Sequence, residues 1–301
     1  MVSASSLLLP SSVRDFASCI SDGAAACTVP SSTRISSSSS STLSVSFSYH
    51  VKREEDECLL LRLTWAHSPL GPTLSFSASA RQVLVRRRKG SCSVPSGDAA
   101  ADVPPSPPLA LFWDLTAARY DAAASPEPVS GYYVVVAVDS AEVVLAVGDM
   151  AADFVRTKFD QIRLLPTPPF SRGERVVLSS LPAAAAAEIT HTARARFAEG
   201  GAEHEVTVGC SPGGDELWVS IDGKRAVQAR RLRWNFRGNQ TVFVDGEPVD
   251  VMWDLHGWCF GAGAAVVMLR ARTALESRLW LDDEAAAPGF SLLVQAFKSP
   301  P

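Results

Sequence analysis

One short tryptophan-containing sequence occurs twice in the chain, 140 positions apart. Residues 109–115 read LALFWDL, and residues 249–255 read VDVMWDL. Two further pairs of segments match upstream in the same order: 74–76 with 217–219, and 88–90 with 236–238. A repeat of this length, present in two copies, is far longer than a solenoid repeat. It predicts one β-rich unit that is duplicated within the chain, and it constrains architecture rather than chemistry.

The composition excludes some classes of protein. Hydrophobic residues make up 47% of the 301 positions, charged residues 20%, and the formal net charge is -4. A dedicated nucleic-acid-binding domain is usually strongly basic, so a nucleic-acid partner is not expected. The most apolar stretch, 132–147, is interrupted by Asp139 and Glu142 and falls short of the ~18 apolar residues of a membrane span. We therefore expect an ordinary globular protein without a membrane span.

Cysteine and histidine spacing gives no metal or cofactor signature. The six cysteines contain no C-x-x-C pair, which favours free thiols in a reducing compartment over a disulfide framework or a structural zinc site. His191, His204 and Glu205 match no familiar ligand spacing, and we predict that they lie on solvated strand edges. The glycine-rich segment 261–266 lacks the third glycine of a dinucleotide loop. No metal and no cofactor are expected.

The N-terminal residues bear on localisation. Leu7–Leu9 is too short for the apolar core of a signal peptide, so the protein is not expected to be secreted. The Ser-rich, acid-poor composition is also compatible with a plastid transit peptide, but a disordered N-terminus is the favoured interpretation. We expect a cytoplasmic protein, with the nucleus as the alternative because Arg86–Lys89 could act in nuclear import.

Changes in composition divide the chain into five parts. A Ser/Ala-rich start lacks the large apolar groups that offset ordering entropy, and it is therefore predicted to be disordered. The predicted parts are a disordered segment 1–42, a first β repeat with a following hairpin 43–150, a connecting segment with an Ala-rich loop 151–188, a second β repeat 189–281 and a disordered tail 282–301.

Period-two alternation predicts strands in most of the ordered region. A hairpin is expected with arms Tyr132–Val138 and Val143–Val147, and a short helix at Ala151–Phe159. Asp222-Gly223 and Asp245-Gly246 are hairpin turn signals. Short strands at such regular spacing are typical of an antiparallel β-sandwich or a flattened barrel. The predicted fold is therefore all-β and built from two homologous repeats.

Several motifs resemble a plant-specific family known as domain of unknown function 868. The strongest is LRWNFRGNQT at 232–241, and the others are VRDFASC at 13–19, PEPVSGYY at 126–133, FWDL at 112–115 and WDLH at 253–256. The similarity spans about Val13 to Trp280. The first half departs from the family pattern around Arg86–Lys89, where a strand is short and lacks aromatic residues. The resemblance implies a β-rich plant protein with no assigned activity.

A row of arginines is the first candidate site. If 226–236 is a strand, Arg231, Arg233 and Arg237 lie on one face, while Leu232, Trp234 and Phe236 face the core. Guanidinium groups in such a row could bind an anionic small molecule or a protein partner. In the alternative interpretation the row is purely structural, and acids on neighbouring strands neutralise it: Asp222, Asp245, Glu247 and Asp250.

Asp254 and His256 form the second candidate, a polar pair on one face of an extended segment. An aspartate can orient a histidine that acts as a general base. No G-x-S-x-G nucleophile motif accompanies the pair. The alternative is a structural corner in which the carboxylate of the shared Trp-Asp motif accepts hydrogen bonds from turn amides.

These observations favour a non-catalytic binding or protein-interaction module whose partner is an unknown protein or an anionic small molecule. One alternative is a hydrolase-type enzyme that uses Asp254 and His256 in a cleft between the repeats. Another is a lipocalin-like carrier of a small apolar ligand, because a closed β unit can hold one such ligand. A deep polar cavity would favour the enzyme, a dry apolar cavity the carrier, and a filled core the interaction module.

Overall fold

The computed structural model describes most of the chain from Ser39 onward. The described residues are 39–52, 58–69, 71–78, 81–94, 108–121, 125–138, 142–159, 167–179, 188–211, 214–261, 263–272 and 289–298. Some predicted segments lie outside these ranges: residues 1–38, most of the Pro-rich stretch 97–108, the Ala-rich loop 183–187 and part of the predicted C-terminal tail.

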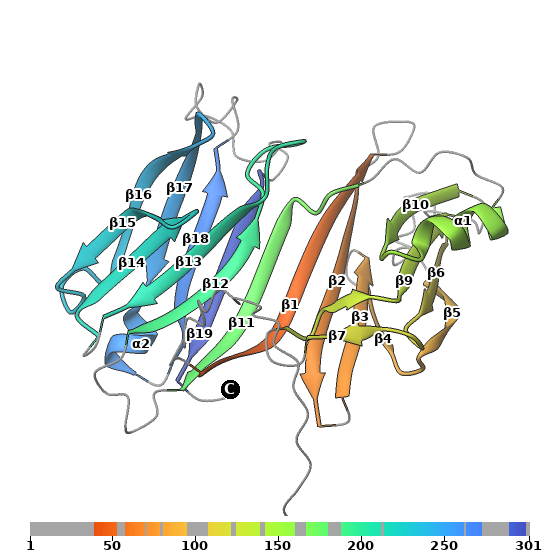
Figure 1. The fold of residues 1–301 in the computed structure, drawn as a ribbon, viewed down its shortest axis with the longest axis horizontal. Coiled ribbons are helices and arrows are strands. Elements are labelled where there is room, and N and C mark those ends of the chain that lie inside the picture. The colour runs from red at the N-terminus through yellow and green to blue at the C-terminus, as the bar shows by residue number, and fades with distance from the viewer. Residues whose placement is uncertain are drawn as a thin grey trace, which may run out of the picture. The chain divides into compact units, whose positions relative to one another are not determined.

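A nine-stranded sheet runs through both halves of the chain (Figure 1). From edge to edge it contains β16 (Arg237–Val244), β17 (Glu247–Asp254), β18 (Ala265–Ala271), β19 (Ser291–Phe297), β11 (Ser171–Ser179), β1 (Ser39–Lys52), β2 (Cys58–Ser68), β3 (Gly71–Ala78) and β4 (Arg81–Val85). Neighbouring strands pair antiparallel except β11 and β19, which pair in parallel. Because strands of both halves share this sheet, residues 36–301 form one compact unit.

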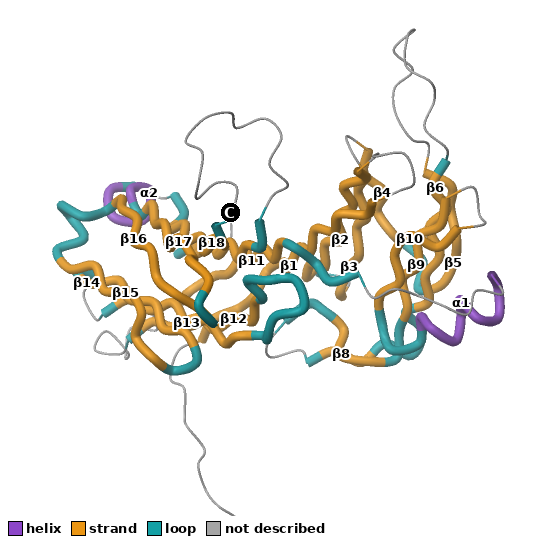
Figure 2. The backbone as a smooth tube through the Cα atoms, turned by 90° about the horizontal axis from the view of Figure 1, so that it is seen from above, coloured by secondary structure: helices purple, strands orange, loops and turns teal. Residues whose placement is uncertain are grey.

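Two four-stranded antiparallel sheets complete the fold. The first contains β10 (Glu142–Val147), β9 (Tyr133–Val138), β6 (Leu109–Asp114) and β5 (Lys89–Val94), in that order, and the second contains β12 (Ile189–Ala195), β13 (His204–Cys210), β14 (Glu216–Ile221) and β15 (Lys224–Arg230). Figure 2 shows β12 and β13 in a layer of their own beside β17 and β18. The smaller elements are β7 (Arg119–Tyr120), β8 (Pro128–Ser130), α1 (Ala151–Phe159) and α2 (His256–Phe260).

Each four-stranded sheet shares a hydrophobic core with part of the nine-stranded sheet. The first core contains Val45 and Phe47 of β1 together with Leu111 of β6, and the second contains Val249 of β17 together with Val219 of β14. Burial of one such side chain contributes ~1.5–3 kcal/mol, so alternation along a strand directs one face inward. The predicted all-β class is therefore confirmed. The described strands form open sheets and no closed barrel.

The two central strands of the first four-stranded sheet are buried on both faces. Every residue of β6 and of β9 is buried. Phe112 and Val135 point away from the first core and pack with Ala151 and Val155 of α1. Two-sided burial explains why β6 and β9 read as continuous apolar runs instead of alternating ones. The predicted helix at 151–159 and the predicted hairpin are both confirmed.

Three strands lie at least partly in segments for which the sequence predicted no strand. β1 begins at Ser39, inside the predicted disordered segment 1–42. The backbone of residues 39–42 pairs with β11, and this pairing does not require large apolar side chains. β11 itself lies within the predicted connecting segment 151–188. β19 lies in the predicted disordered tail 282–301, where Leu292, Val294 and Ala296 alternate toward the second core. Pairing between distant segments thus organises stretches that looked featureless.

Candidate functional site

A groove of about 650 Å³ lies over the middle of the nine-stranded sheet. On its floor, Phe47 of β1 pairs with Arg172 of β11, and Val45 pairs with Glu174. Paired side chains share a face of the sheet. Phe47 belongs to the first core, and Val176, which follows Glu174 on the same face, belongs to the second. Both four-stranded sheets therefore pack on one face, and β1 and β11 form the floor between them.

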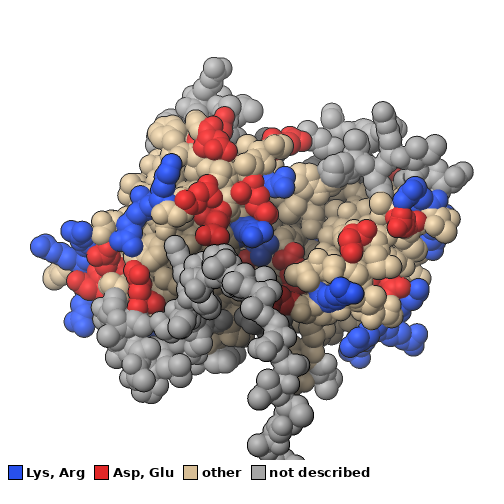
Figure 3. All heavy atoms as spheres, in the orientation of Figure 1, with Lys and Arg blue, Asp and Glu red and all other residues tan. Residues whose placement is uncertain are grey.

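The lining of the groove is strongly polar. One wall is the segment that leads into and out of β8, and the other is β12 with the turn that follows it. The charged and polar lining residues are Thr42, Asp121, Ser125, Glu127, Arg172, Glu174, His191, Thr192, Arg194, Glu203 and Glu205. Figure 3 shows Asp and Glu side chains gathered around basic ones over the middle of the visible face.

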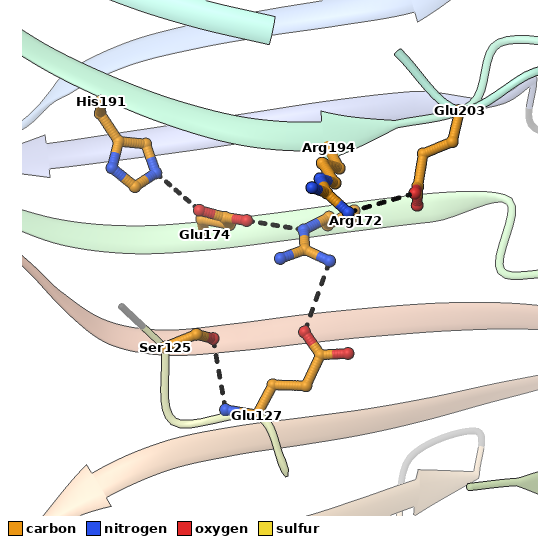
Figure 4. A network of polar contacts seen from close by, with 7 residues as sticks. All are labelled: Ser125, Glu127, Arg172, Glu174, His191, Arg194 and Glu203. Carbon is orange, nitrogen blue, oxygen red and sulfur yellow. Dashed lines mark hydrogen bonds and ion pairs between the residues drawn. The ribbon is translucent and has the colours of Figure 1, made fainter. Parts of the chain in front are cut away.

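A charged triad joins the floor to the β12 wall (Figure 4). Glu174 is only 3% exposed, and both of its carboxylate oxygens are engaged. Arg172 Nε donates to Oε1 at 2.6 Å, and His191 Nε2 lies 2.6 Å from Oε2. The guanidinium of Arg172 also lies 5.0 Å from the centre of the Phe47 ring. The triad therefore ties the second four-stranded sheet to the central strand of the large sheet.

The neighbours of Glu174 keep it ionised. Burial alone raises the pKa of this carboxyl, because a charge loses its hydration. The hydrogen bond from His191 and the positive charge of Arg172 outweigh burial, and the net pKa lies below its ordinary value of 4.5. A buried carboxylate of this kind needs all of its partners, since a buried charge without a partner costs several kcal/mol.

Glu127 faces the triad from the opposite wall and behaves differently. Its Oε2 lies 3.5 Å from Arg172 Nη1, and its backbone N–H donates to Ser125 Oγ at 3.2 Å. Burial raises the pKa of Glu127, Arg172 partly offsets this effect, and the charges of Glu174 and Glu203 add to it. The groove thus holds one carboxyl with a lowered pKa and one with a raised pKa.

The groove also contains the open edge of a sheet. β12 pairs only with β13, so its other side is an edge. Asp222 donates its backbone N–H to Glu205 O at 2.8 Å, so the backbone of Glu205 faces β14. The backbone N–H and C=O groups of successive residues in a strand point to opposite sides. Val206 therefore directs its backbone groups toward its partner Ala193 on β12. It follows that Thr192, the neighbour of Ala193, directs its N–H away from β13. No other described strand pairs with this side of β12.

The prediction that His191 and His204 lie on solvated strand edges is wrong. Both are buried, with 6% and 7% exposure. His204 Nδ1 lies 2.7 Å from Asp222 and Nε2 lies 3.1 Å from Asp245, so this ring joins two hairpin turns. The sequence pattern indicates the burial of His191, because this residue is in phase with Ala193 and Ala195 in the period-two alternation of β12. Alternation assigns both histidines to core faces.

The two Trp-Asp motifs form equivalent corners, as the structural alternative predicted. Asp114 accepts a hydrogen bond from the backbone N–H of Thr116 at 3.0 Å, and Asp254 accepts one from His256 at 2.9 Å. The indole N–H of each motif donates to a backbone carbonyl, from Trp113 to Arg87 at 2.8 Å and from Trp253 to Asn235 at 3.0 Å. Lys89 pairs with Asp114, and Arg237 pairs with Asp254.

The structure does not assemble Asp254 and His256 into an extended dyad. His256 starts α2, and its backbone rather than its ring bonds to Asp254. Its imidazole packs instead against the rings of Phe236 and Phe260. The carboxylate of Asp254 is occupied by Arg237 and the turn amide. These residues lie outside the lining of the groove.

The predicted arginine row is not a strand face. β15 ends at Arg230, and Arg231 has a φ of 57°, which turns the chain. Leu232 is buried as predicted, but Trp234 is 85% exposed and does not face the core. Arg237 lies on β16, beyond the turn. The three arginines are exposed at one end of the second half, and their binding role stays a prediction.

The remaining features of the described residues are modest. An apolar cavity of about 40 Å³ lies inside the second half near Cys210 and Trp258. Burial raises the pKa of the Cys210 thiol to about 11. No group of three or more metal-ligating side chains occurs in the described part of the chain. In the same part, no helix has the length and apolar character to cross a membrane.

Comparison with known proteins gives one match. A search of curated proteins and a search of solved structures each found nothing similar to the chain. A family model described as a plant protein of unknown function, DUF868, matches residues 40–298, which include every described strand except the first residue of β1. The chain therefore belongs to this plant family of unknown function.

Proposed function

We propose that the protein is a non-catalytic interaction module that binds an extended, basic peptide segment of a partner protein in the central groove. The observation that carries this proposal is the open edge of β12, which lies inside a polar groove. A peptide that adds a strand to such an edge gains backbone hydrogen bonds, and the flanking side chains then give specificity.

The charge of the groove favours a cationic ligand. Its lining contains the carboxylates of Asp121, Glu127, Glu174, Glu203 and Glu205 against the guanidinium groups of Arg172 and Arg194. Glu203 is 48% exposed, and Arg194 lies 3.9 Å from it. Lysine or arginine side chains at alternate positions of a bound strand would reach these acids. Charge complementarity of this kind raises the association rate and selects the partner.

The floor supports recognition because it is rigid. Glu174 and His191 are buried and hold each other at 2.6 Å, so neither is available as a nucleophile or a mobile base. Preformed surfaces bind with a smaller entropic cost than surfaces that must become ordered. For this reason we favour binding over hydrolysis. A carrier of an apolar ligand is not favoured either, because a cavity of about 40 Å³ has room for little more than one water molecule.

We also infer that the two halves are copies of one unit. β1–β4 and β12–β15 each run in sequence order across their sheets, and β5-β6-β9-β10 corresponds to β16-β17-β18-β19. The matching hydrogen bonds of the two Trp-Asp corners support this inference. An experimental structure in which β6 and β17 fail to superpose together with their neighbouring strands would refute it.

A display library of random 12-residue peptides, selected against the full chain, tests the peptide proposal. Selected peptides should be enriched in lysine and arginine at alternate positions. Binding of a fluorescent selected peptide should be lost in Thr192→Pro, which removes an outward N–H but no bond to β13. Thr192→Val is the matched control, because it also removes the hydroxyl contact with Thr207 but keeps the N–H.

Two results would contradict the proposal. One is a set of selected peptides without basic enrichment. The other is equal peptide affinity of the proline and valine variants when both melt at the wild-type temperature. A further check is the double variant Glu203→Gln and Glu205→Gln, which should weaken binding and reduce its dependence on salt. Salt screens the attraction between these carboxylates and the basic side chains of the peptide, and the variant has lost that attraction.

A further inference from the structure

A rigid turn between β15 and β16 presents one tryptophan to solvent. Trp234 and Asn235 both donate backbone N–H groups to Arg231 O, at 2.8 and 3.0 Å, and Asn235 Nδ2 donates to Arg230 O at 2.7 Å. Leu232 is 1% exposed and anchors the turn in the second core. With the backbone fixed in this way, the indole of Trp234 stays 85% exposed. An exposed tryptophan on an ordered turn is a large apolar surface, and no contact of its ring with another described residue accounts for it.

Further aromatic rings lie beside this turn. The rings of Phe236, His256 and Phe260 form a cluster with centroid distances of 5.3 to 5.6 Å. Phe260 is 53% exposed, so α2 presents a second aromatic ring to solvent, in contact with Phe236 of the segment that follows the turn. The described pockets do not include Trp234 or Phe260. With Trp234 85% exposed and Phe260 53% exposed, this end of the molecule presents protruding aromatic side chains.

Basic side chains surround these rings. Arg231 and Arg233 are exposed, and neither forms an ion pair with a described residue. Arg237 lies over Phe236, and Lys298 Nζ lies 5.1 Å from the centre of the Trp258 ring. Near the left edge of Figure 3, where β15 ends in Figure 1, basic side chains project from the molecule beside acidic ones. The surface thus combines aromatic groups with positive charge.

We propose that the surface formed by Arg231, Arg233, Trp234 and Phe260 docks the protein onto an anionic membrane. Tryptophan is enriched at the headgroup level of bilayers, and basic side chains are attracted to anionic headgroups. A protruding turn can insert between headgroups, whereas a peptide would need a groove. A single-stranded nucleic acid would need a basic channel along which several bases stack. This surface is separate from the groove, so the two proposals stand or fall independently.

Co-sedimentation of the full chain with vesicles tests this docking. Wild-type protein should bind vesicles of mixed phosphatidylserine and phosphatidylcholine at about 0.1 M salt, and should bind phosphatidylcholine vesicles much more weakly. Trp234→Ala should lower the partition coefficient about tenfold. The double variant Arg231→Gln and Arg233→Gln should lower it roughly 25-fold, because each basic residue contributes about fivefold, or ~1 kcal/mol.

Phe243→Ala is the matched control. Phe243 is 75% exposed at the other end of β16, beside the Asp245-Gly246 turn, so its loss should leave vesicle binding unchanged. Absence of wild-type binding to the anionic vesicles would overturn the proposal, and so would equal losses in Trp234→Ala and Phe243→Ala. Binding of a single-stranded RNA oligonucleotide that depends on Trp234, without vesicle binding, would overturn it in favour of a nucleic-acid partner.

Discussion

The two halves of the molecule bury different kinds of side chain. In the first half, the core is apolar, and Asp114 is the one buried ionisable side chain among its described acidic and basic residues. In the second half, Glu174, His191 and His204 are all buried at the margins of the core. Apolar burial needs no specific partner, whereas a buried charge needs a complete set of partners. The stability of the second half should therefore depend more on individual residues and on pH.

The Trp-Asp corners sharpen this contrast because their hydrogen bonds correspond. The carboxylate of Asp114 is 10% exposed and that of Asp254 is 46% exposed. Each binds a turn amide and a basic residue of the neighbouring strand. Water screens the exposed pair far more than the buried one. The same local motif should therefore contribute different free energies in the two halves.

The largest predicted effect is at Glu174. Glu174→Gln removes the negative charge between Arg172 and His191, and the partly buried guanidinium keeps only the longer contact with Glu127. The free energy of unfolding should fall by ~3–5 kcal/mol, measured by urea denaturation at pH 7. Glu142→Gln, at the exposed first position of β10, is the control and should change stability by less than ~0.5 kcal/mol. Equal stability of the two variants would contradict the proposed asymmetry.

The next largest effect concerns a close approach that both halves share. Gly238 packs against the indole of Trp253, and Gly90 packs against that of Trp113. A Cβ would lie 2.3 Å from the ring at Gly238 and 2.9 Å at Gly90. Both alanine variants should lose ~1–3 kcal/mol through overpacking, and Gly238→Ala should lose more.

Chemical denaturation of the two alanine variants measures this difference. A larger loss for Gly90→Ala would show that burial of the ring sets the cost. Trp113 is 6% exposed, whereas Trp253 is only partly buried and has more room to move aside. That result would reverse the order predicted from distance alone and would place the more sensitive corner in the first half.

Local sequence patterns predicted the parts of the fold that depend on local interactions. α1, the β9–β10 hairpin and the Asp-Gly turns follow from periodicity and turn chemistry, and Asp222 and Asp245 adopt the positive φ of 50° that such turns require. β11 and β19 were missed because their parallel pairing joins residues 120 positions apart, as with Ser171 and Ser291. No local pattern encodes a pairing over that distance.

The candidate site could be predicted only in part for the same reason. Glu174 is in phase with Val176 on β11, so the sequence places a charge on a core face. Its partners Arg172 and His191 can be recognised only once β11 and β12 lie side by side. The arginine row was mispredicted because Arg231 adopts a left-handed conformation that is uncommon for residues other than glycine, asparagine and aspartate. A single residue thus converted an apparent strand face into a turn.

The pH dependence of stability should separate the two carboxyls of the groove. The pKa of Glu174 is lowered in the folded state, so its contribution is present above its ordinary value of 4.5 and is lost as pH falls through the folded pKa. The pKa of Glu127 is raised, mainly by burial, so ionisation of Glu127 disfavours folding above that pKa. Thermal melts from pH 3 to 7 should show a smaller loss of stability in acid for Glu174→Gln than for wild type.

Glu127→Gln should change the pH dependence of stability in the opposite direction. Its stability relative to wild type should improve as pH rises, because the variant avoids a carboxylate that is costly to bury. If both variants shift the pH profile in the same direction, the two carboxyls do not differ as their surroundings indicate.

The smallest predicted effect compares the two corner carboxylates directly. Asp114→Asn and Asp254→Asn both keep an oxygen that can accept the turn amide, and both lose the ion pair with Lys89 or Arg237. Asp114→Asn should cost ~1–2 kcal/mol, since hydrogen bonds to a largely buried charged group are the stronger class. Asp254→Asn should cost about 0.5 kcal/mol or less, because its pair is exposed. Urea denaturation of both variants at low and high salt shows whether burial of the carboxylate determines the loss of stability. If the two losses are equal and both fall with salt, the ion pair that the two corners share sets the cost, and burial of the carboxylate does not.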